Sequence, residues 1–256
     1  MENVYGGFVR LVDTMGDDTS IVEAARVSYG GGTKTVRGAE GLIRYLMRHW
    51  HTTPFEMVEF KFHIKMPMFV ARQHFRHRTA SVNEMSARYS VIPQEFFVPE
   101  GYRKQSVLNK QSSDDAAVPK DSVLRYQTTE HCTKAFELYE EILNDGGCRE
   151  LARCHLPQST YTEFYWKIDL HNLLHYLQLR MGQGAQKEIR SYAEAIYRLV
   201  QPKVPITMLA FRDFRLESVT LSAVDIDCLQ SNSLPPAGGE REEFLVKMKR
   251  LGINII

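Results

Sequence analysis

The segment from residue 72 to residue 90 contains the side chains of this sequence that are best suited to binding a small phosphorylated molecule. Its charged residues are four arginines and a single acid: Arg72, Arg76, Arg78, Arg88 and Glu84. The planar guanidinium group of arginine forms paired hydrogen bonds with a phosphate group or an imide edge. Polar side chains that can complete such a site lie between the arginines, namely Gln73, Ser81, Asn83 and Ser86. A basic, solvated helix end is the alternative interpretation of this composition.

The elements that must position these side chains are predicted from the periodicity of apolar residues. Apolar and charged residues alternate from 58 to 66, which is typical of a half-buried strand. A helix is expected to follow, on which Gln73, Arg76 and His77 would share one face because they lie three and four residues apart. A second alternating stretch, from 164 to 170, runs into another predicted helix.

The rest of the chain shows the same two periodicities. A strand is expected at 8–12, and helices are expected after a capping-box spacing at 20–23 and at 42–50, 173–180, 189–200 and 244–251. Trp50 and Trp166 are expected in the core. Helices and strands without regular βαβ alternation predict an α+β fold with a mainly antiparallel sheet. We expect one catalytic domain over residues 1–256, with a flexible polar loop at about 103–121 and a C-terminal extension at about 217–256.

The overall composition limits the class of protein. The chain has 256 residues, with 32 basic against 31 acidic side chains and a net charge of +1. This balance argues against a surface built to coat nucleic acid. The longest apolar run, from 66 to 71, is far shorter than the ~20 residues that span a bilayer. The four cysteines form no C-x-x-C pair, and no secretory signal is visible. We therefore expect a cytoplasmic protein that interacts with neither membranes nor nucleic acid.

The order of residues from 76 to 89 resembles the motif of flavin-dependent thymidylate synthases. The pattern here is Arg-His-Arg-x-x-Ser-x-Asn-x-x-Ser-x-Arg-Tyr. Further segments resemble the family in the expected order: Ala25-Arg26-Val27-Ser28, His51-Thr52-Thr53-Pro54-Phe55-Glu56, Phe69-Val70-Ala71-Arg72-Gln73 and Leu177-Gln178-Leu179-Arg180. Together they cover roughly Phe8 to Phe211, which is most of the chain.

This resemblance implies a ligand set. Family members bind FAD, 2′-deoxyuridine 5′-monophosphate (dUMP) and 5,10-methylenetetrahydrofolate, and they take reducing equivalents from NADPH. The residues implied to bind the cofactor are Ser28, Thr53, Arg76, His77, Arg78, Glu84, Asp169, His171 and His175. Those implied to bind dUMP are Gln73, Arg76, Glu84, Ser86, Ala87, Arg88, Arg153 and Arg180. His51 resembles a family residue near the flavin and the folate.

The resemblance also implies a mechanism, in which Arg180 is the catalytic residue. Its guanidinium would contact the N3 edge of the pyrimidine and stabilise negative charge there. Glu84, among so many arginines, is expected to stay ionised and orient them. Ser86 is interpreted as a ligand and not as a nucleophile, because no Ser-His-Asp arrangement would activate it. No cysteine lies in the matching segments, in agreement with a mechanism that needs no protein thiol. The family also implies a homotetramer with active sites shared between subunits.

The sequence departs from the family pattern at four positions. Asp169, His171 and His175 stand where Asn, Arg and Asn are expected, and Ala87 replaces a frequent glycine. The two histidines are four residues apart, as in zinc hydrolases, but Asn172 occupies the position of the glutamate base in H-E-x-x-H. A metal site is therefore the less favoured interpretation, and no metal is expected. A module in which the arginines bind RNA or DNA is disfavoured because no aromatic platform lies beside them.

Overall fold

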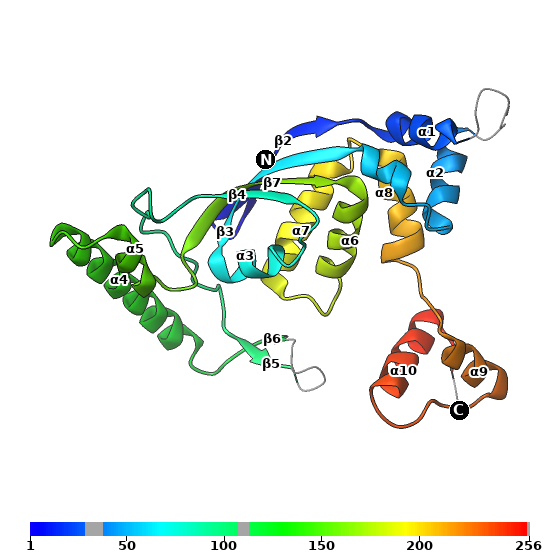
Figure 1. The fold of residues 1–256 in the computed structure, drawn as a ribbon. Helices are drawn as coiled ribbons and strands as arrows, with labels where there is room; N and C mark the ends of the chain where they lie inside the picture. Colours follow the sequence, from blue (N-terminus) through cyan, green and yellow to red (C-terminus); the bar gives the residue numbers. More distant parts are fainter. Residues whose placement is uncertain (29–37, 107–112, 255–256) are drawn as a thin grey trace. The chain divides into compact units, whose positions relative to one another are not determined.

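The computed structural model describes residues 1–28, 38–106 and 113–254 (Figure 1). The chain separates into two compact units, Met1–Ala210 and Phe211–Ile256. The predicted α+β class is confirmed, because helices pack on an antiparallel sheet in the first unit. A single catalytic domain over the whole chain stays a prediction.

The central sheet has five antiparallel strands in the order β1-β2-β3-β7-β4. The strands are β1 (Glu2–Val4), β2 (Gly7–Met15), β3 (Glu59–Pro67), β4 (Ser81–Glu84) and β7 (Tyr161–Asp169). The two strands predicted from alternation are neighbours, with Phe62 opposite Trp166. Their apolar side chains are fully buried on one face, and the alternating polar side chains form the other face. The alternation arises because successive strand residues point to opposite sides of a sheet.

Three helices pack against the sheet: α3 (Met68–His74), α6 (Leu170–Arg180) and α7 (Lys187–Val200) (Figure 1). Both α3 and α6 begin directly where β3 and β7 end, so each predicted strand passes into its predicted helix. Helix α7 ends at Val200, where the predicted helix over 189–200 ends, and Pro202 follows two residues later. The opposite face of the sheet carries polar pairs, such as the stacked rings of His63 and Tyr165 at 4.7 Å.

A group of short elements lies at one end of the sheet: α1 (Asp18–Val27), α2 (Ala39–Arg48), the 3₁₀ helix η2 (Thr53–Met57) and α8 (Pro205–Phe211). The predicted capping box at 20–23 is wrong: Asp17 caps α1, and its partner is Ser20. The carboxylate of Asp17 accepts the Ser20 N–H. Asp17 is therefore the N-cap residue, and helix α1 begins at the next residue, Asp18.

Trp50 is not in the core, contrary to expectation, whereas Trp166 is fully buried. Helix α2 ends at Arg48, and the chain then turns through a left-handed backbone at Trp50, where φ is 59°. The predicted helical face over 42–50 therefore stops two residues early. As a result, 65% of the Trp50 surface is exposed.

The other end of the first unit contains α4 (Asp121–Asn144), α5 (Arg149–Ala152), the 3₁₀ helix η3 (Arg153–His155) and the hairpin strands β5 (Arg103–Gln105) and β6 (Ser113–Ala117). Within the predicted polar loop at about 103–121, the described residues include the paired strands β5 and β6. Helix α4 was not expected from periodicity. Few of its residues are buried, among them Phe136 and Tyr139, so its apolar pattern is weak.

The second unit is a small helical arrangement of its own. It contains the π-helical turn η4 (Arg212–Leu216), α9 (Ala223–Ser231) and α10 (Gly239–Leu251). Cys228, Phe244 and Met248 form its core. Lys247 of α10 donates to the buried Asp225 carboxylate at 2.6 Å and so ties the two helices together. The predicted C-terminal helix is confirmed. No helix among the described residues is both long and apolar enough to cross a bilayer.

Candidate active site

Three of the predicted site residues meet where helices α3 and α6 end. Arg180 is the last residue of α6, and its Nε donates to His77 Nε2 at 3.0 Å. Its Nη2 donates to the backbone carbonyl of Gln73 at 3.0 Å. The guanidinium is thus held in one plane by two acceptors from the motif segment. This is the fixed orientation that a directional contact with a planar base requires.

The predicted helical face of Gln73, Arg76 and His77 is wrong. Helix α3 ends at His74. The Phe75 N–H still donates four residues back, to Ala71, but the N–H groups of Arg76 and His77 donate three residues back instead of four. His77 N–H, for example, donates to the His74 carbonyl at 3.1 Å. Such bonds tighten the last turn of a helix and turn the chain away from its axis. Arg76 and His77 therefore lie in a turn, and it is the turn that brings the His77 ring to Arg180.

The environment of His77 keeps its imidazole neutral. Burial, the positive charge of Arg180 and the nearby His175 ring together lower the pKa of His77 to about 4. A neutral ring with Nε2 as the acceptor carries its proton on Nδ1. Because the ring is uncharged, it can accept from the Arg180 guanidinium without like-charge repulsion. The ring of Tyr176 packs against it with centroids 4.9 Å apart.

His74 lies directly beneath this junction and is fully buried. Its Nδ1 is 3.1 Å from the Tyr176 hydroxyl, and its ring centroid is 4.3 Å from that of Trp166. Burial, followed by the charges of His77 and Arg180, lowers the pKa of His74 to about 3. The side chain therefore supports the site as a neutral, aromatic packing group.

Acidification is expected to destabilise the fold through His74. Its pKa is 6.5 as a free side chain and about 3 in the folded protein, so between these values the unfolded state binds the extra proton. The stability that comes from keeping His74 neutral is fully present above pH 6.5 and is lost as the pH falls toward 3. Between pH 7 and pH 5 this group alone accounts for about 2 kcal/mol of unfolding free energy. Urea denaturation at the two pH values measures the loss, and it should shrink in His74→Phe; an unchanged pH dependence in that variant contradicts the assignment.

Gln73 is held by a chain of polar contacts that sequence reasoning missed. Gln73 Nε2 donates to Gln186 Oε1 at 2.5 Å, and Gln186 Nε2 donates to Glu188 Oε2 at 2.7 Å. Arg103 of β5 donates to both oxygens of the Glu188 carboxylate, at 2.9 and 3.1 Å. Because the Gln73 amide nitrogen is engaged, its Oε1 is the atom left to accept from a ligand. The signal was present in the sequence: Glu188 is an acid on the buried face of α7, one turn before Tyr192.

Ser28, Thr53 and His51 are brought together in one cavity of about 810 Å³. Ser28 follows α1, and Thr53 begins η2. The remaining described residues of its wall are mainly apolar: Ala24, Ala25, Val27, Leu42, Leu46, Trp50, Thr52, Pro54 and Met57. The cavity therefore offers apolar walls with a few hydroxyl and imidazole groups. Such a lining suits the ring portion of a ligand more than its phosphates.

The predicted phosphate ligands form a second cluster. Arg88 pairs with Glu150 at 3.2 Å, and Arg153 Nε donates to the Glu150 carbonyl at 3.3 Å. Ser86 Oγ accepts from the Arg88 N–H at 3.3 Å. Ala87 packs against the core of α4. Arg88 and Arg153, which come from distant segments, thus both contact Glu150. In the described part of the chain no hydrogen bond or ion pair joins this cluster to Arg180.

Glu84 does not orient the arginines, contrary to expectation. It is the last residue of β4, and its Oε1 accepts from the Thr162 hydroxyl of the neighbouring strand β7 at 2.5 Å. Arg76 and Arg78 are exposed, and neither has a carboxylate partner among the described residues. Their guanidinium groups thus remain available to an external anion. The strand pairing, which places Glu84 opposite Phe164, explains why Glu84 faces Thr162.

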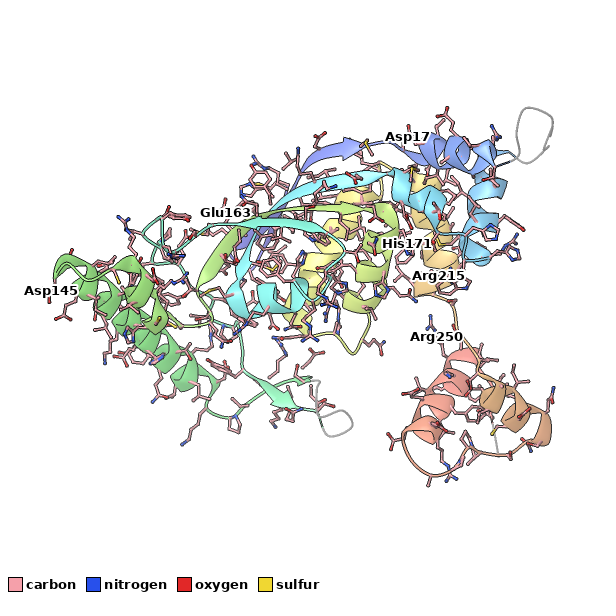
Figure 2. All side chains as sticks on the ribbon, in the orientation of Figure 1. Asp17, Asp145, Glu163, His171, Arg215 and Arg250 are labelled. Carbon is pink, nitrogen blue, oxygen red and sulfur yellow. The ribbon has the colours of Figure 1, made fainter. Side chains whose placement is uncertain are left out.

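Asp169 and His171 lie at the start of α6, and His175 lies in its middle. Figure 2 labels His171. Asp169 caps the helix, and its two oxygens accept from the N–H and side-chain amide of Asn172 at 2.9 and 2.7 Å. Its carboxylate is thus already engaged. The ring of His175 is 6.0 Å from that of His77, which places one of these residues beside the motif. Among the described residues, no group of three His, Cys, Asp or Glu side chains is arranged to hold a metal ion.

The chemistry of these groups fits a flavin dinucleotide and a nucleotide. Arg76 and Arg78 are exposed cations suited to a pyrophosphate, and the 810 Å³ cavity is suited to an aromatic ring system. Arg88 and Arg153 form a second cationic cluster suited to one phosphate. Arg180 adds a guanidinium whose plane is already fixed.

Comparisons with known proteins agree with this chemistry. Residues 10–206 match the family described as Thymidylate synthase complementing protein. A flavin-dependent thymidylate synthase of Thermus thermophilus is 54% identical over 229 residues, which cover 90% of this chain and 84% of the relative. The enzyme of the same name from Dictyostelium discoideum is 50% identical over 260 residues, 97% of this chain and 86% of the relative.

A solved structure shares the fold. The UMP/dUMP methylase PolB from Streptomyces cacaoi, bound with 5-Br dUMP, superposes with a TM-score of 0.75 at 33% identity. The match covers 84% of this chain and 99% of the methylase. The family match spans the motif, the 810 Å³ cavity, the phosphate cluster and Arg180 together. On the sequence and on the fold, this chain belongs to the thymidylate synthase complementing protein family.

Proposed function

We propose that this protein is a flavin-dependent thymidylate synthase, which methylates carbon 5 of dUMP to give dTMP. The proposed carbon donor is 5,10-methylenetetrahydrofolate, and the proposed reductant is NADPH. The observation that carries the proposal is the junction of Arg180 with His77 and Gln73 at the motif. It is supported by relatives of this name that are about half identical to the chain.

In this proposal the role of Arg180 is to activate the pyrimidine. Carbon 5 of uracil is a weak nucleophile in the neutral base, and it becomes stronger when negative charge on the ring is stabilised. A guanidinium held in a fixed plane can stabilise that charge at the N3 edge. The neutral His77 ring and the Gln73 carbonyl hold this plane in advance, so no reorganisation is needed when charge develops.

The residues proposed to hold FAD divide by chemistry. Arg76 and Arg78 bind the pyrophosphate, and Ser28 and Thr53 donate hydrogen bonds from the wall of the cavity. FAD, when bound, supplies the hydride that reduces the transferred carbon. His51 lies in the same wall and contacts the flavin or the folate. Glu84, Asp169, His171 and His175 complete the proposed set around the cofactor.

The phosphate of dUMP is proposed to bind at Arg88 and Arg153. Glu150 competes with it, because the Glu150 carboxylate already pairs with Arg88 at 3.2 Å. Arg153→Ala is expected to raise KM for dUMP by about 10- to 100-fold with little change in kcat, since a charge-assisted bond is lost in both ground and transition states. Steady-state kinetics with dUMP measure this effect.

The control is a substitution that removes the acid of this cluster and keeps its arginines. Glu150→Gln removes the competing charge and should leave KM for dUMP unchanged or lower it. A rise of KM in Glu150→Gln equal to that in Arg153→Ala would contradict this arrangement, because it would indicate general disruption of the α5 region.

We also propose a homotetramer with shared active sites in the cytoplasm. The phosphate cluster and the Arg180 junction are separate groups of contacts within one chain, and a neighbouring subunit could join them in one site. All four cysteines are free thiols, as is usual in a reducing compartment. Sedimentation analysis tests the tetramer.

The visible spectrum of the purified protein tests the function. We expect flavin absorbance, bleached by NADPH faster when dUMP is present, and formation of dTMP once 5,10-methylenetetrahydrofolate is added. A colourless protein that FAD does not reconstitute would rule out the proposal. Stoichiometric zinc whose removal abolishes activity would favour the metal-site alternative.

A further inference from the structure

The Gln73 side chain ends a series of hydrogen bonds that starts at a buried ion pair. Arg103 of β5 donates to both oxygens of the Glu188 carboxylate, at 2.9 and 3.1 Å, and only 5% of the Glu188 side chain is exposed. Gln186, at the start of α7, donates from Nε2 to Glu188 Oε2 at 2.7 Å. Its Oε1 accepts from Gln73 Nε2 at 2.5 Å. Four side chains from β5, the start of α7 and α3 thus form one relay.

The chemistry of these groups gives the relay a direction. A guanidinium only donates hydrogen bonds and a carboxylate only accepts them, whereas a glutamine amide has one end of each kind. Because the Glu188 carboxylate accepts, Gln186 turns its NH2 end toward Glu188 and its oxygen toward Gln73. Gln73 in turn directs its NH2 end toward Gln186. The two ends of an amide have nearly the same shape, so these partners decide that Gln73 Oε1 is the end directed elsewhere.

Gln73 also contacts the residue that is proposed to activate the pyrimidine. Its backbone carbonyl accepts from Arg180 Nη2 at 3.0 Å. Since Arg180 is proposed to contact the N3 edge of the base, the Gln73 side chain is suited to contact the same edge. Between its two carbonyl groups, uracil carries N3–H, which donates a hydrogen bond. Cytosine carries an N3 without hydrogen, which accepts one. An oxygen presented by Gln73 therefore suits uracil and leaves cytosine with two acceptors facing each other.

We propose that Arg103, Glu188 and Gln186 are positioning residues that select uracil over cytosine, because they direct Gln73 Oε1 toward the N3–H of dUMP. This inference rests on the proposed function, which supplies the nucleotide. The three residues act on the base through Gln73. Burial strengthens the selection, since a hydrogen bond shielded from water depends more strongly on the polarity of its partner. The hairpin of β5 and β6 thus contributes to specificity through Arg103.

Glu188→Gln is expected to reverse the direction of the relay. The amide that it introduces keeps the shape of the side chain, and its oxygen must face Arg103, so its NH2 end faces Gln186. Gln186 and Gln73 then turn over in succession, and Gln73 presents its NH2 end to the base. Calorimetric titration of the FAD-loaded protein with dUMP and with 2′-deoxycytidine 5′-monophosphate (dCMP) measures the ratio of the dCMP Kd to the dUMP Kd. We expect this ratio to fall by about 10-fold in Glu188→Gln.

Two further variants accompany this test. Glu194→Gln removes the same charge from a part-buried position of the same helix, and it should leave the ratio unchanged. Gln186→Met interrupts the relay and keeps the ion pair of Arg103 with Glu188, so it serves as the test even if Glu188→Gln does not fold. The ratio should fall in Gln186→Met as well, because an unheld Gln73 amide can turn either end to the base.

The ratio separates a positioning role from a structural one. A general loosening of the site weakens dUMP and dCMP by the same factor and leaves the ratio as it is. An unchanged ratio in folded Glu188→Gln or in Gln186→Met therefore overturns the inference. So does an unmodified protein that binds dCMP as tightly as dUMP. If the unmodified, FAD-loaded protein binds neither nucleotide, it is the proposed function that fails.

Discussion

Arg180→Ala is expected to lower kcat for dTMP formation by about 10²- to 10³-fold at saturating dUMP, as is typical when one preorganised donor to a developing charge is removed. The side chain is held by His77 and by the Gln73 carbonyl, each at 3.0 Å, so its contribution depends on orientation as well as charge. Exchange of the hydrogen at carbon 5 should be lost with it. Release of tritium from dUMP labelled at carbon 5 measures this step apart from the rest of the reaction.

Two control variants test whether the loss of activity is specific to the guanidinium of Arg180. Arg180→Lys keeps the positive charge but not the planar fork, so its activity should stay close to that of Arg180→Ala. Arg198→Ala removes an exposed arginine of α7 that pairs with Glu2 at 3.0 Å, and it should leave dTMP formation unchanged. Retained tritium release in Arg180→Ala would show that another group activates the pyrimidine.

Glu188→Ala is expected to lower the free energy of unfolding by about 3 kcal/mol, because removal of one partner leaves the rest of a buried charge network uncompensated. Only 5% of the Glu188 side chain and 20% of the Arg103 side chain are exposed. The substitution removes the acceptor of both Arg103 and Gln186. Gln186 is then free to turn away from Gln73, and KM for dUMP should rise as well. Urea denaturation and steady-state kinetics measure the two effects.

A matched control lies on the same helix. Glu194 is part-buried on α7 and has no hydrogen bond or ion pair among the described residues. Glu194→Ala should change the unfolding free energy by less than about 0.5 kcal/mol and leave KM for dUMP unaltered. Equal effects of the two substitutions would mean that the Glu188 contacts carry no particular role.

The strands and helices next to the motif could be predicted because their patterns are local. Residues 58–66 alternate strictly, and this alternation appears in the structure as the buried face of β3. The same holds for β7, whose buried residues face those of β3 across the sheet. Helix α4 was missed because its exposed residues far outnumber its buried ones, so no apolar stripe marks it. The end of α3 was misplaced because the tight turn after His74 leaves no clear trace in helical spacing.

The residues of the site could be predicted from the sequence, but the contacts between them could not. Trp50 illustrates the limit: aromatic residues are usually buried, and only the left-handed turn after α2 shows that this one faces a cavity. Glu84 illustrates it again, because its partner is a hydroxyl on the neighbouring strand and not one of the arginines close to it in sequence. Sequence distance is a poor guide to which polar groups meet.

The sequence alone identified the family, predicted the ligand classes and predicted the two strand-to-helix units, since these depend on residue type and on spacing within about ten positions. The tertiary structure decided which of these residues act together. Arg180 meets His77 across 103 residues of chain, and Gln73 meets Gln186 across 113. Such contacts depend on how β3 and β7 pair and on where α3 and α6 end. Both features are set by the packing of the shared core, and this packing cannot be predicted from a local sequence pattern.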